Sequence, residues 1–373
     1  MEYREYRDKK LSRLGYGCMR FPLREGSATA IDEKRAEGLL ERALFAGITY
    51  FDTAYPYHGK TSEEFVGRVL SKHPRDSFAL ATKLPVFNIK TREEGEEIFS
   101  SQLVKLRTSY FDFYLLHAMN AGRFETVKGL GLYDMLREKK EKGIIRSLGF
   151  SFHDSPDVLE RILDQWPFDF VQIQLNYLDW ELQNAERQYQ VITERGLPVV
   201  VMEPVRGGAL SKLPKEAEEL LRSMHPEWSP AAWALRWVAS KPGVMVVLSG
   251  MSAEDQLEDN LSTFSSLEPW RDDEEKALSK AREILLSAGT VKCTGCKYCL
   301  PCTKGIEIPS LFSMYNDYLI QGDREKLCSG YRKTPVPASS CIDCLKCVRA
   351  CPQKLEVNKL IKQVEKTAKA YGA

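Results

Sequence analysis

The sequence lacks a long apolar run, an apolar leader and an excess of charge of either sign. No apolar segment approaches the about 20 residues with which a helix spans a bilayer. Residues 1–10 have no apolar core of the kind found in signal peptides. Lys and Arg number 53 against 52 Asp and Glu, which leaves a formal net charge of +1. We therefore expect a cytoplasmic protein that binds neither membranes nor nucleic acids.

Cysteine is nearly absent from the first three quarters of the chain. Of the ten cysteines, only Cys18 precedes Cys293, and the other nine lie between Cys293 and Cys351. From Val291 onward, Cys, Lys, Gly and Pro replace the alternating patterns that precede them. This change in composition predicts two domains, one over residues 1–288 and the other over residues 289–373.

The first domain carries the pattern of repeated βα units. Short β-branched or aromatic runs alternate with helical patterns, such as 34–45, 92–106 and 127–142, which indicates a parallel sheet. Eight strands are predicted, at 16–18, 50–54, 79–83, 113–117, 146–151, 170–174, 199–203 and 245–248. No Gly-x-Gly-x-x-Gly opens a helix, and eight strands in about 250 residues fit a closed barrel better than an open sheet. The expected fold class is therefore α/β, a TIM (β/α)8 barrel.

Two cysteine runs define the second domain. They read Cys293-x2-Cys296-x2-Cys299-x2-Cys302 and Cys341-x2-Cys344-x2-Cys347-x3-Cys351-Pro352. The second run matches the bacterial ferredoxin pattern, in which the fourth cysteine binds the other cluster. We therefore expect a small α-helical ferredoxin-like iron–sulfur domain with two [4Fe–4S] clusters. The ligands would be Cys293, Cys296, Cys299 and Cys351 for one cluster, and Cys341, Cys344, Cys347 and Cys302 for the other.

Other chemistries of cysteine fit these runs less well. Zinc accepts four thiolates in two Cys-x2-Cys pairs, but eight cysteines exceed what one zinc site needs. Disulfides are disfavoured in a reducing compartment. The first run has one residue fewer before its last cysteine than the common spacing, and we expect the ligand assignment to survive this change. Cys18 and Cys328 lie outside both runs and are expected to be packed thiols.

Four polar residues lie at or just beyond the carboxyl ends of predicted strands, where barrel enzymes place their chemistry. Asp52 and Tyr57 stand in Phe-Asp-Thr-Ala-Tyr-Pro-Tyr-His, Lys83 in Leu-Ala-Thr-Lys-Leu, and His117 in Tyr-Leu-Leu-His-Ala. These segments resemble the catalytic tetrad of the aldo-keto reductase family, in family order from residue 14 to about residue 260. The resemblance implies an NAD(P)H-linked oxidoreductase that reduces a small carbonyl compound or oxidises an alcohol.

The chemistry of these four residues is consistent with that resemblance. A carbonyl that accepts a hydride needs a proton donor, and a tyrosine with a pKa of about 10 is a poor acid near neutrality. We expect Lys83 to lower the pKa of Tyr57, Asp52 to fix Lys83, and His117 to orient the carbonyl oxygen. If each residue were considered alone, Asp52 would be interpreted as the cap of the next helix and His117 as a hydrogen-bonded histidine of the core.

The resemblance also suggests where a dinucleotide binds. It implies contacts of Ser151, Gln172 and Met202 with the nicotinamide. At the adenosine end it implies contacts from Ser249, Gly250, Gln256 and Asn260. Gly250 and Gln256 stand where NADPH-specific relatives carry a lysine and an arginine. NAD(H) is therefore at least as well matched as NADP(H), because a 2′-phosphate would lose its charged partners.

Two further segments resemble the branch of the family that carries a C-terminal ferredoxin-like domain binding two [4Fe–4S] clusters. They are Gly17-Cys18-Met19-Arg20 and Glu203-Pro204-Val205-Arg206-Gly207-Gly208. We expect Arg20 and Arg206 to face the barrel rim, where each would bind an acidic substrate group or a cofactor phosphate. A bare surface arginine is an equally fair interpretation.

Electron counting leaves the role of the clusters open. A hydride carries two electrons and a [4Fe–4S] cluster carries one, and nothing in the sequence indicates the flavin that would split the pair. The clusters would relay electrons from a ferredoxin or another carrier, sense the redox state, or hold the second domain together. The alternative function is a non-catalytic barrel that senses nucleotide or redox state and carries an electron-transfer module.

Overall fold

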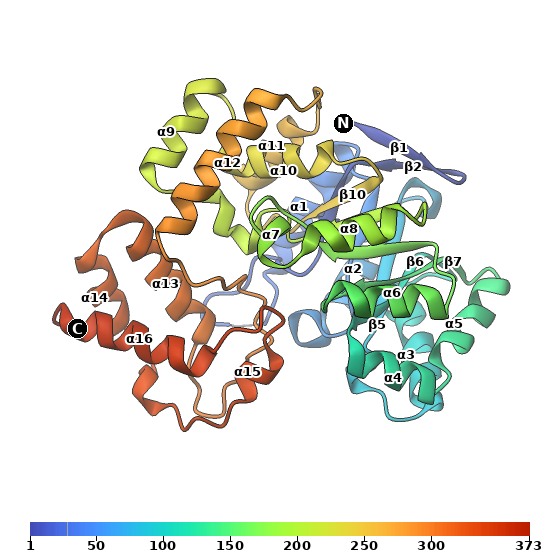
Figure 1. The fold of residues 1–373 in the computed structure, drawn as a ribbon. Helices are drawn as coiled ribbons and strands as arrows, with labels where there is room; N and C mark the ends of the chain where they lie inside the picture. The colour runs from blue at the N-terminus through green and yellow to red at the C-terminus, as the bar shows by residue number, and fades with distance from the viewer. Residues whose placement is uncertain (28) are drawn as a thin grey trace. The chain divides into compact units, whose positions relative to one another are not determined.

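The computed structural model describes residues 1–27 and 29–373, and they form two compact units. The first unit comprises residues 1–204 and 234–269, and the second comprises residues 205–233 and 270–373 (Figure 1). We predicted a boundary at residue 288. The second compact unit also includes residues that precede this boundary. Helix α9, Lys215–Met224, packs along helix α12, Asp272–Ser287, and both helices belong to the second unit.

The other elements follow the chain in this order. The strands are β1 Tyr3–Tyr6, β2 Lys9–Ser12, β3 Leu14–Gly17, β4 Tyr50–Asp52, β5 Ala79–Leu84, β6 Phe111–Met119, β7 Ile145–Phe152, β8 Phe170–Gln174, β9 Val199–Met202 and β10 Val244–Ser249. The remaining helices are α1 Glu33–Phe45, α2 Ser62–Leu70, α3 Arg92–Lys105, α4 Ala121–Gly129, α5 Leu132–Glu141, α6 Pro156–Gln165, α7 Asp179–Leu182, α8 Ala185–Thr193, α10 Pro230–Ser240, α11 Glu254–Thr263, α13 Ile308–Gln321, α14 Arg324–Arg332, α15 Lys346–Ala350 and α16 Val357–Ala370.

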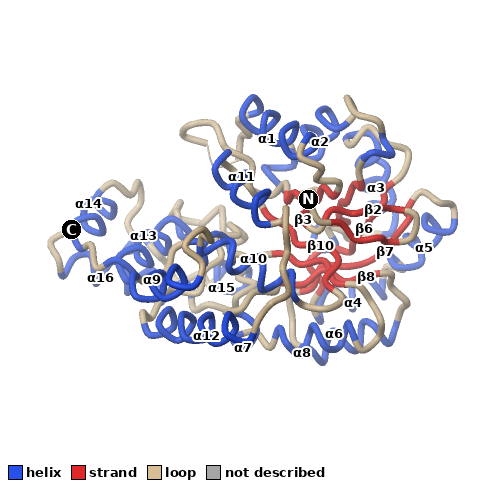
Figure 2. The backbone as a smooth tube through the Cα atoms, turned by 90° about the horizontal axis from the view of Figure 1, so that it is seen from above, coloured by secondary structure: helices blue, strands red, loops and turns tan. Residues whose placement is uncertain are grey.

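The first unit is a closed parallel barrel, which confirms the predicted fold class. Its strands neighbour one another in the order β10-β3-β4-β5-β6-β7-β8-β9, and helices surround them (Figure 2). All eight predicted strands are present. The strands are buried on both faces, as in β6, where all nine residues are buried. This is the environment that selects continuous β-branched and aromatic runs in parallel sheets.

The barrel helices form where apolar residues recur at helical spacing. Helix α1 buries Ala36, Leu39, Leu40 and Ala43, and the side chain of Asp32 caps its first turn by accepting a hydrogen bond from the Arg35 amide. The single helix predicted over 127–142 is wrong, because the chain forms α4 and α5 instead. Gly131 lies between them with φ 61°, a left-handed conformation that glycine adopts without strain.

The N-terminal hairpin of β1 and β2 was not predicted. Tyr6 and Leu11 of this hairpin pack against the apolar interior of the barrel, which includes Tyr50, Phe113 and Met245 from the first residues of three strands. The hairpin therefore closes the amino-terminal end of the barrel. Catalytic residues of TIM barrels lie at the opposite end, so this plug contributes to stability and leaves the carboxyl rim open for a site.

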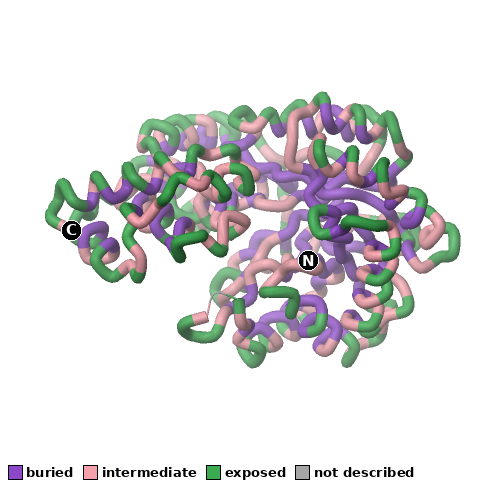
Figure 3. Tube along the Cα trace, turned by 90° about the horizontal axis from the view of Figure 1, so that it is seen from below, coloured by how far each residue is buried: buried purple, intermediate pink, exposed green. Residues whose placement is uncertain are grey.

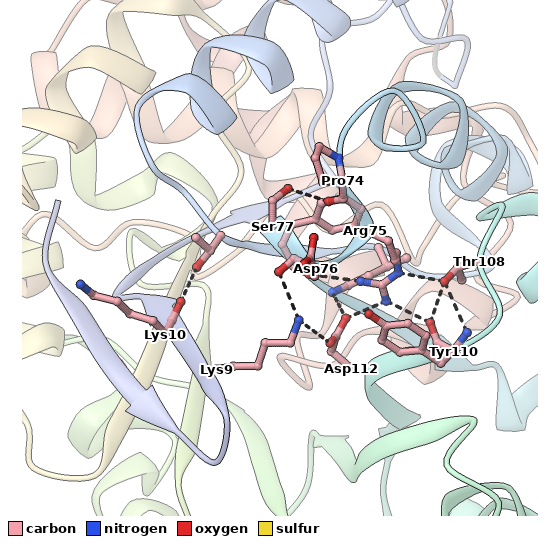
Figure 4. Close-up of polar contacts among 12 residues, drawn as sticks. Lys9, Lys10, Pro74, Arg75, Asp76, Ser77, Thr108, Tyr110 and Asp112 are labelled. Atoms are coloured by element: carbon pink, nitrogen blue, oxygen red, sulfur yellow. Dashed lines mark hydrogen bonds and ion pairs between the residues drawn. The ribbon is translucent and has the colours of Figure 1, made fainter.

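A buried carboxylate fastens the hairpin to the start of β6. Asp112 is 2% exposed, and its Oδ2 atom accepts hydrogen bonds from Arg75 at 2.7 Å and from the Leu80 amide at 2.9 Å. Lys9 of the hairpin reaches the other carboxylate oxygen of Asp112 at 3.3 Å and the Asp76 carbonyl at 3.4 Å (Figure 4). These contacts tie three segments together at the end of the barrel opposite the candidate site.

The second unit has its own apolar core. Its centre is formed by residues from α13, α14 and α16, together with Val291, Ile306 and Ala338 from the connecting loops. Cysteines of both runs pack against this core at its edge. Buried positions in Figure 3 accordingly occur in two kinds of place, along the barrel strands and on the inner faces of helices. Within residues 1–27 and 29–373, no helix is both long and apolar enough to cross a membrane.

Candidate functional site

Three neighbouring strands hold three of the four predicted catalytic residues at the carboxyl rim of the barrel. Asp52 ends β4, Lys83 lies near the end of β5, and His117 lies near the end of β6. Asp52, Lys83 and His117 are 3%, 1% and 2% exposed. Tyr57 is partly exposed and begins a short 3-10 turn after β4. The structure therefore brings all four side chains to one place.

The ammonium of Lys83 links these side chains. Its Nζ atom donates to Asp52 Oδ1 at 2.5 Å and to the Thr53 carbonyl at 2.9 Å, and it lies 3.5 Å from the Tyr57 hydroxyl. The rings of Tyr57 and His117 meet edge to face, with centroids 6.0 Å apart. Tyr57 thus has the fixed ammonium of Lys83 near its hydroxyl and the imidazole of His117 against its ring.

The pKa of Tyr57 departs from our expectation. We predicted that Lys83 would lower it, but burial raises the pKa of Tyr57 well above its ordinary value, and the negative charges of Asp52 and Glu203 add to this effect. Desolvation therefore outweighs the charge of Arg20, which lowers the pKa of Tyr57. The hydroxyl remains protonated near neutrality, which suits a residue that donates a proton. The charge of Lys83 then acts after transfer, when the oxygen becomes negative.

His117 is held in its neutral form. Burial, and then the charges of Lys83, His153 and Arg123, lower the pKa of His117 well below its ordinary value. Its Nδ1 atom has no hydrogen-bond partner within residues 1–27 and 29–373. Burial of such a nitrogen without a partner is costly, which indicates a place for a ligand atom. A neutral imidazole can donate one hydrogen bond to a carbonyl oxygen without competing for the proton that the tyrosine supplies.

Ser151 and Gln172, predicted to bind a nicotinamide, lie opposite each other on β7 and β8. The hydroxyl oxygen of Ser151 accepts a hydrogen bond from the Ala118 amide at 2.7 Å and still has its own proton to donate. Gln172 is 2% exposed, and its Nε2 atom lies 3.7 Å from the sulfur of Met202. Its Oε1 atom is buried without a partner in the described part of the chain. A hydroxyl donor beside an open amide acceptor is the pair that a carboxamide requires.

Arg20, from a distant part of the sequence, lies against the segment that we predicted to bind the adenosine. Asn260 donates to the Ser249 hydroxyl at 2.9 Å, and Gln256 accepts hydrogen bonds from the amide and hydroxyl of Ser252. A Cβ atom at Gly250 would lie 3.0 Å from the Cβ of Arg20 and 3.1 Å from its Cγ. Because Gly250 has no side chain, the aliphatic part of the Arg20 side chain can lie close to its backbone.

Sequence analysis had not singled out Glu203 as a functional residue. It follows β9 with φ 57°, and its carboxylate lies 3.3 Å from the guanidinium of Arg20. A non-glycine residue in this left-handed conformation is uncommon and often marks a functional site. The two opposite charges sit at the rim beside the tyrosine, whose pKa both of them influence.

The second unit contains two cavities that the cysteines surround. One cavity is lined by Cys293, Cys296, Cys299 and Cys351. The other is lined by Cys302, Cys341, Cys344 and Cys347, with Cys299 lining both. Each cavity thus takes cysteines from both runs. Within residues 1–27 and 29–373, no group of three or more His, Cys, Asp or Glu side chains is arranged to hold a single metal ion.

The two cysteine runs share one backbone geometry. In the first run Gly295 and Lys297 have left-handed φ angles of 63° and 63°, and in the second run Asp343 and Leu345 have 51° and 58°. These residues stand two and four positions after the first cysteine of each run. The Gly295 amide donates to Cys293 Sγ at 3.3 Å, and the Asp343 amide donates to Cys341 Sγ at 3.4 Å. Amides directed at sulfur stabilise the negative charge of thiolate ligands.

Burial opposes free thiolates in the first cavity. It raises the pKa of the Cys299 thiol to about 12, and the neighbouring Cys296 and Cys293 add to the rise. A positively charged iron core would offset this cost, because metal ligation deprotonates a thiol outright. The donor set and the cavity therefore fit an iron–sulfur cluster.

Arg206, which we expected to face the barrel rim, contacts the segments that carry two of the cysteines. It belongs to the second unit, is 3% exposed, and donates to the Lys292 carbonyl at 3.1 Å and to Gln353 Oε1 at 3.4 Å. These two residues flank Cys293 and Cys351, which line the same cavity. Arg206 therefore joins the two segments that carry these cysteines, an arrangement that its position in the sequence did not reveal.

The fold and the four rim residues define an oxidoreductase built on a TIM barrel. The model of the aldo/keto reductase family matches residues 13–283, and the model of a 4Fe-4S dicluster domain matches residues 292–355. The chain belongs to the aldo/keto reductase family and carries a C-terminal iron–sulfur domain. Both points confirm the resemblance drawn from the sequence.

Known relatives match the barrel part of the chain. The NADH-specific methylglyoxal reductase of Escherichia coli (strain K12) is 24% identical over 307 residues, covering 69% of this chain and 91% of the relative. The L-galactose dehydrogenase of Arabidopsis thaliana is also 24% identical over 307 residues, covering 74% and 91%. A solved aldo-keto reductase from Bacillus halodurans in its holo form is 28% identical, with a TM-score of 0.61, covering 75% of this chain and 96% of that one.

Proposed function

We propose that the barrel catalyses NAD(P)H-linked reduction of a small carbonyl compound, and the reverse oxidation of an alcohol, with Tyr57 as proton donor. The observation that carries this proposal is the position of the Tyr57 hydroxyl, 3.5 Å from a lysine that Asp52 and Thr53 hold in place. His117 donates a hydrogen bond to the carbonyl oxygen and orients it. Lys83 stabilises the oxygen of Tyr57 once its proton has left.

The dinucleotide would lie across the carboxyl rim of the barrel. A bound reduced nicotinamide supplies the hydride. Ser151 donates to its carboxamide oxygen and Gln172 accepts from its amide nitrogen, which satisfies the buried Oε1 atom. Ser249, Gly250, Gln256 and Asn260 contact the adenosine end. With Gly250 and Gln256 uncharged, the 2′-phosphate of NADPH gains no charged partner from these two positions, so NADH binds at least as well.

Domain 289–373 would hold two [4Fe–4S] clusters, one in each cysteine-lined cavity. Three ligands of each cluster would come from one run and the fourth from the other run, and this proposal is supported by cavity linings that combine cysteines of both runs. Such clusters transfer single electrons. We place the boundary with barrel domain 1–288 between the two family matches, which end at residue 283 and begin at residue 292.

One anoxic experiment tests both parts of this proposal. Protein purified without oxygen is analysed for iron, acid-labile sulfide and flavin, and NADH oxidation is then followed with a panel of aldehydes that includes methylglyoxal. We expect about eight irons and eight sulfides per chain and aldehyde-dependent oxidation of NADH. Bound zinc without sulfide would contradict the cluster assignment. NADH binding without turnover of any aldehyde would favour the alternative, a non-catalytic sensing barrel.

A further inference from the structure

The residues that line the two cysteine-lined cavities differ in exposure. Among the residues that line the cavity of Cys293, Cys296, Cys299 and Cys351, Lys297 is the one that is exposed. The lining of the second cavity includes six exposed residues, Pro301, Thr303, Lys304, Ile342, Leu345 and Lys346. The second cavity is therefore bordered by more side chains that a partner in solution can contact.

Apolar side chains are unusually open at this second cavity. Ile342 is 55% exposed and Leu345 is 41% exposed. Ile342 directly follows Cys341 and Leu345 directly follows Cys344. The cysteines of this loop line the cavity, and the two aliphatic side chains between them are exposed. A pair of exposed aliphatic side chains with polar neighbours is a common centre for a protein contact. We call Lys304, Ile342, Leu345 and Lys346 the carrier face.

The charge around the carrier face is positive. Lys304 and Lys346 belong to it, and exposed Arg349 donates to the Cys344 carbonyl at 3.2 Å. The acidic neighbour in this run, Asp343, is paired with Lys362 at 2.6 Å and bonded to Asn358 at 3.0 Å. Over residues 292–305 and 341–354 the chain has six Lys or Arg against one Asp. The rest of the chain therefore carries a net negative charge, since the whole has +1.

This charge has a reason in the chemistry of the cluster. Four thiolates around an oxidised [4Fe–4S] core leave a net charge of about −2, which repels an acidic protein. Exposed lysines beside the cluster offset that repulsion and attract negative charge. A cationic partner would instead be repelled by the lysines at the point of contact.

We infer that the carrier face binds an acidic protein electron carrier with a one-electron centre, which reduces the cluster of Cys302, Cys341, Cys344 and Cys347. In this step the carrier loses one electron, the cluster gains it, and no bond forms or breaks. Lys304 and Lys346 steer the carrier, and Ile342 and Leu345 form the apolar centre of the contact. The inference rests on the proposed clusters.

The test uses the full-length protein, loaded with clusters, and an acidic bacterial-type ferredoxin with two [4Fe–4S] clusters as probe. Stopped-flow absorbance measures the rate at which the reduced ferredoxin bleaches the clusters, and calorimetry measures binding of the oxidised ferredoxin. Reduced methyl viologen, a small cation that needs no docking surface, serves as the second donor. The double variant Lys304→Glu, Lys346→Glu is compared with Lys326→Glu, Lys366→Glu, which makes the same charge change on exposed lysines of α14 and α16.

We expect the carrier-face variant to lower the rate with ferredoxin at least tenfold at low salt, while the control variant changes this rate little and the rate with the viologen cation does not fall. Raising the salt to about 1 M, where the Debye length falls to about 3 Å, should remove most of the difference. Equal rates in both variants, or a wild-type rate that rises with salt, would overturn the inference. Wild-type protein without iron and sulfide would overturn the cluster proposal itself, a failure that elemental analysis separates from a failure of docking.

Discussion

The barrel rim and the cysteine loops are built in opposite ways. The rim site takes its polar residues from separate strands, and packing holds them in place, with Lys83 1% exposed and bonded to Asp52 and Thr53. The cysteine loops bring eight cysteines from two short segments to the linings of two cavities. The rim is organised by the packing of the barrel, whereas the loops would be organised around the proposed clusters.

This difference predicts how each region responds to damage. Loss of one rim side chain removes chemistry but leaves the strands that carry it, because the interior of the barrel is packed independently. Loss of one cysteine removes a cluster, and cluster binding contributes to the folding of the loops around it. Substitutions that affect one region and spare the other therefore separate the two.

The largest effect is expected from Tyr57→Phe. Removing the proton donor should lower kcat for carbonyl reduction by about 10²- to 10⁴-fold, while NADH affinity, iron content and unfolding temperature stay the same. Tyr55→Phe is the matched control, since Tyr55 lies in the same loop and its ring contacts Lys60 and Lys105 instead. Steady-state kinetics with calorimetric titration of NADH measure both properties. Retention of most of the rate would show that Tyr57 is not the donor.

Next comes Cys351→Ser, which tests whether the runs exchange ligands. We expect about half of the iron and sulfide to be lost, and the cluster that disappears should be the one held by the first run, although Cys351 belongs to the second. Cys328→Ser is the control, because Cys328 is buried outside both cavities, where its thiol lies 3.4 Å from the Tyr371 carbonyl. Elemental analysis and electron paramagnetic resonance give the answer. Loss of the second run's cluster alone would mean that the exchange is wrong.

A smaller effect concerns the dinucleotide. Gln256→Arg places a cation where the 2′-phosphate of NADPH would lie, and it should shift the preference toward NADPH by about tenfold, or about 1.4 kcal/mol. Gly250 is left unchanged, because a Cβ atom there would crowd the side chain of Arg20, which would have to shift. Gln190→Arg makes the same change on α8 and should leave the preference unaltered. The preference is measured as the ratio of the dissociation constants for NADH and NADPH in the wild type and in each variant. An unchanged ratio would show that this segment does not contact the phosphate.

The smallest effect is expected from pH. Carbonyl reduction requires protonated Tyr57, and since burial raises its pKa above the ordinary value, the proton is retained as the pH rises. The rate of reduction should therefore change less than about twofold between about pH 7 and pH 9. Alcohol oxidation needs the deprotonated form and should become faster over the same range. A pH–rate profile for reduction that falls with an apparent pKa between those values would contradict the assignment.

Much of both regions was predictable because the signals are local. Eight buried strands appear as eight β-branched or aromatic runs, and ligand exchange is suggested by spacing within the cysteine runs. The features that were not predicted depend on contacts between residues far apart in the sequence or on burial. The hairpin of β1 and β2 consists of two four-residue strands that are stabilised by docking on the barrel. The partners of Arg206 lie 86 and 147 residues away. The pKa of Tyr57 depends on burial, which a linear sequence does not display.

The central claim is that hydride chemistry belongs to the barrel and does not pass through the clusters. The most direct test is anoxic reduction of an aldehyde, in ordinary water, with NADH that carries deuterium at both C4 positions, followed by mass spectrometry of the alcohol. Our account predicts one deuterium on the carbinol carbon of the product, because a nicotinamide hydride moves to carbon without exchanging with solvent. A product with solvent hydrogen at that carbon would contradict it, since electrons relayed through iron–sulfur clusters arrive without the label.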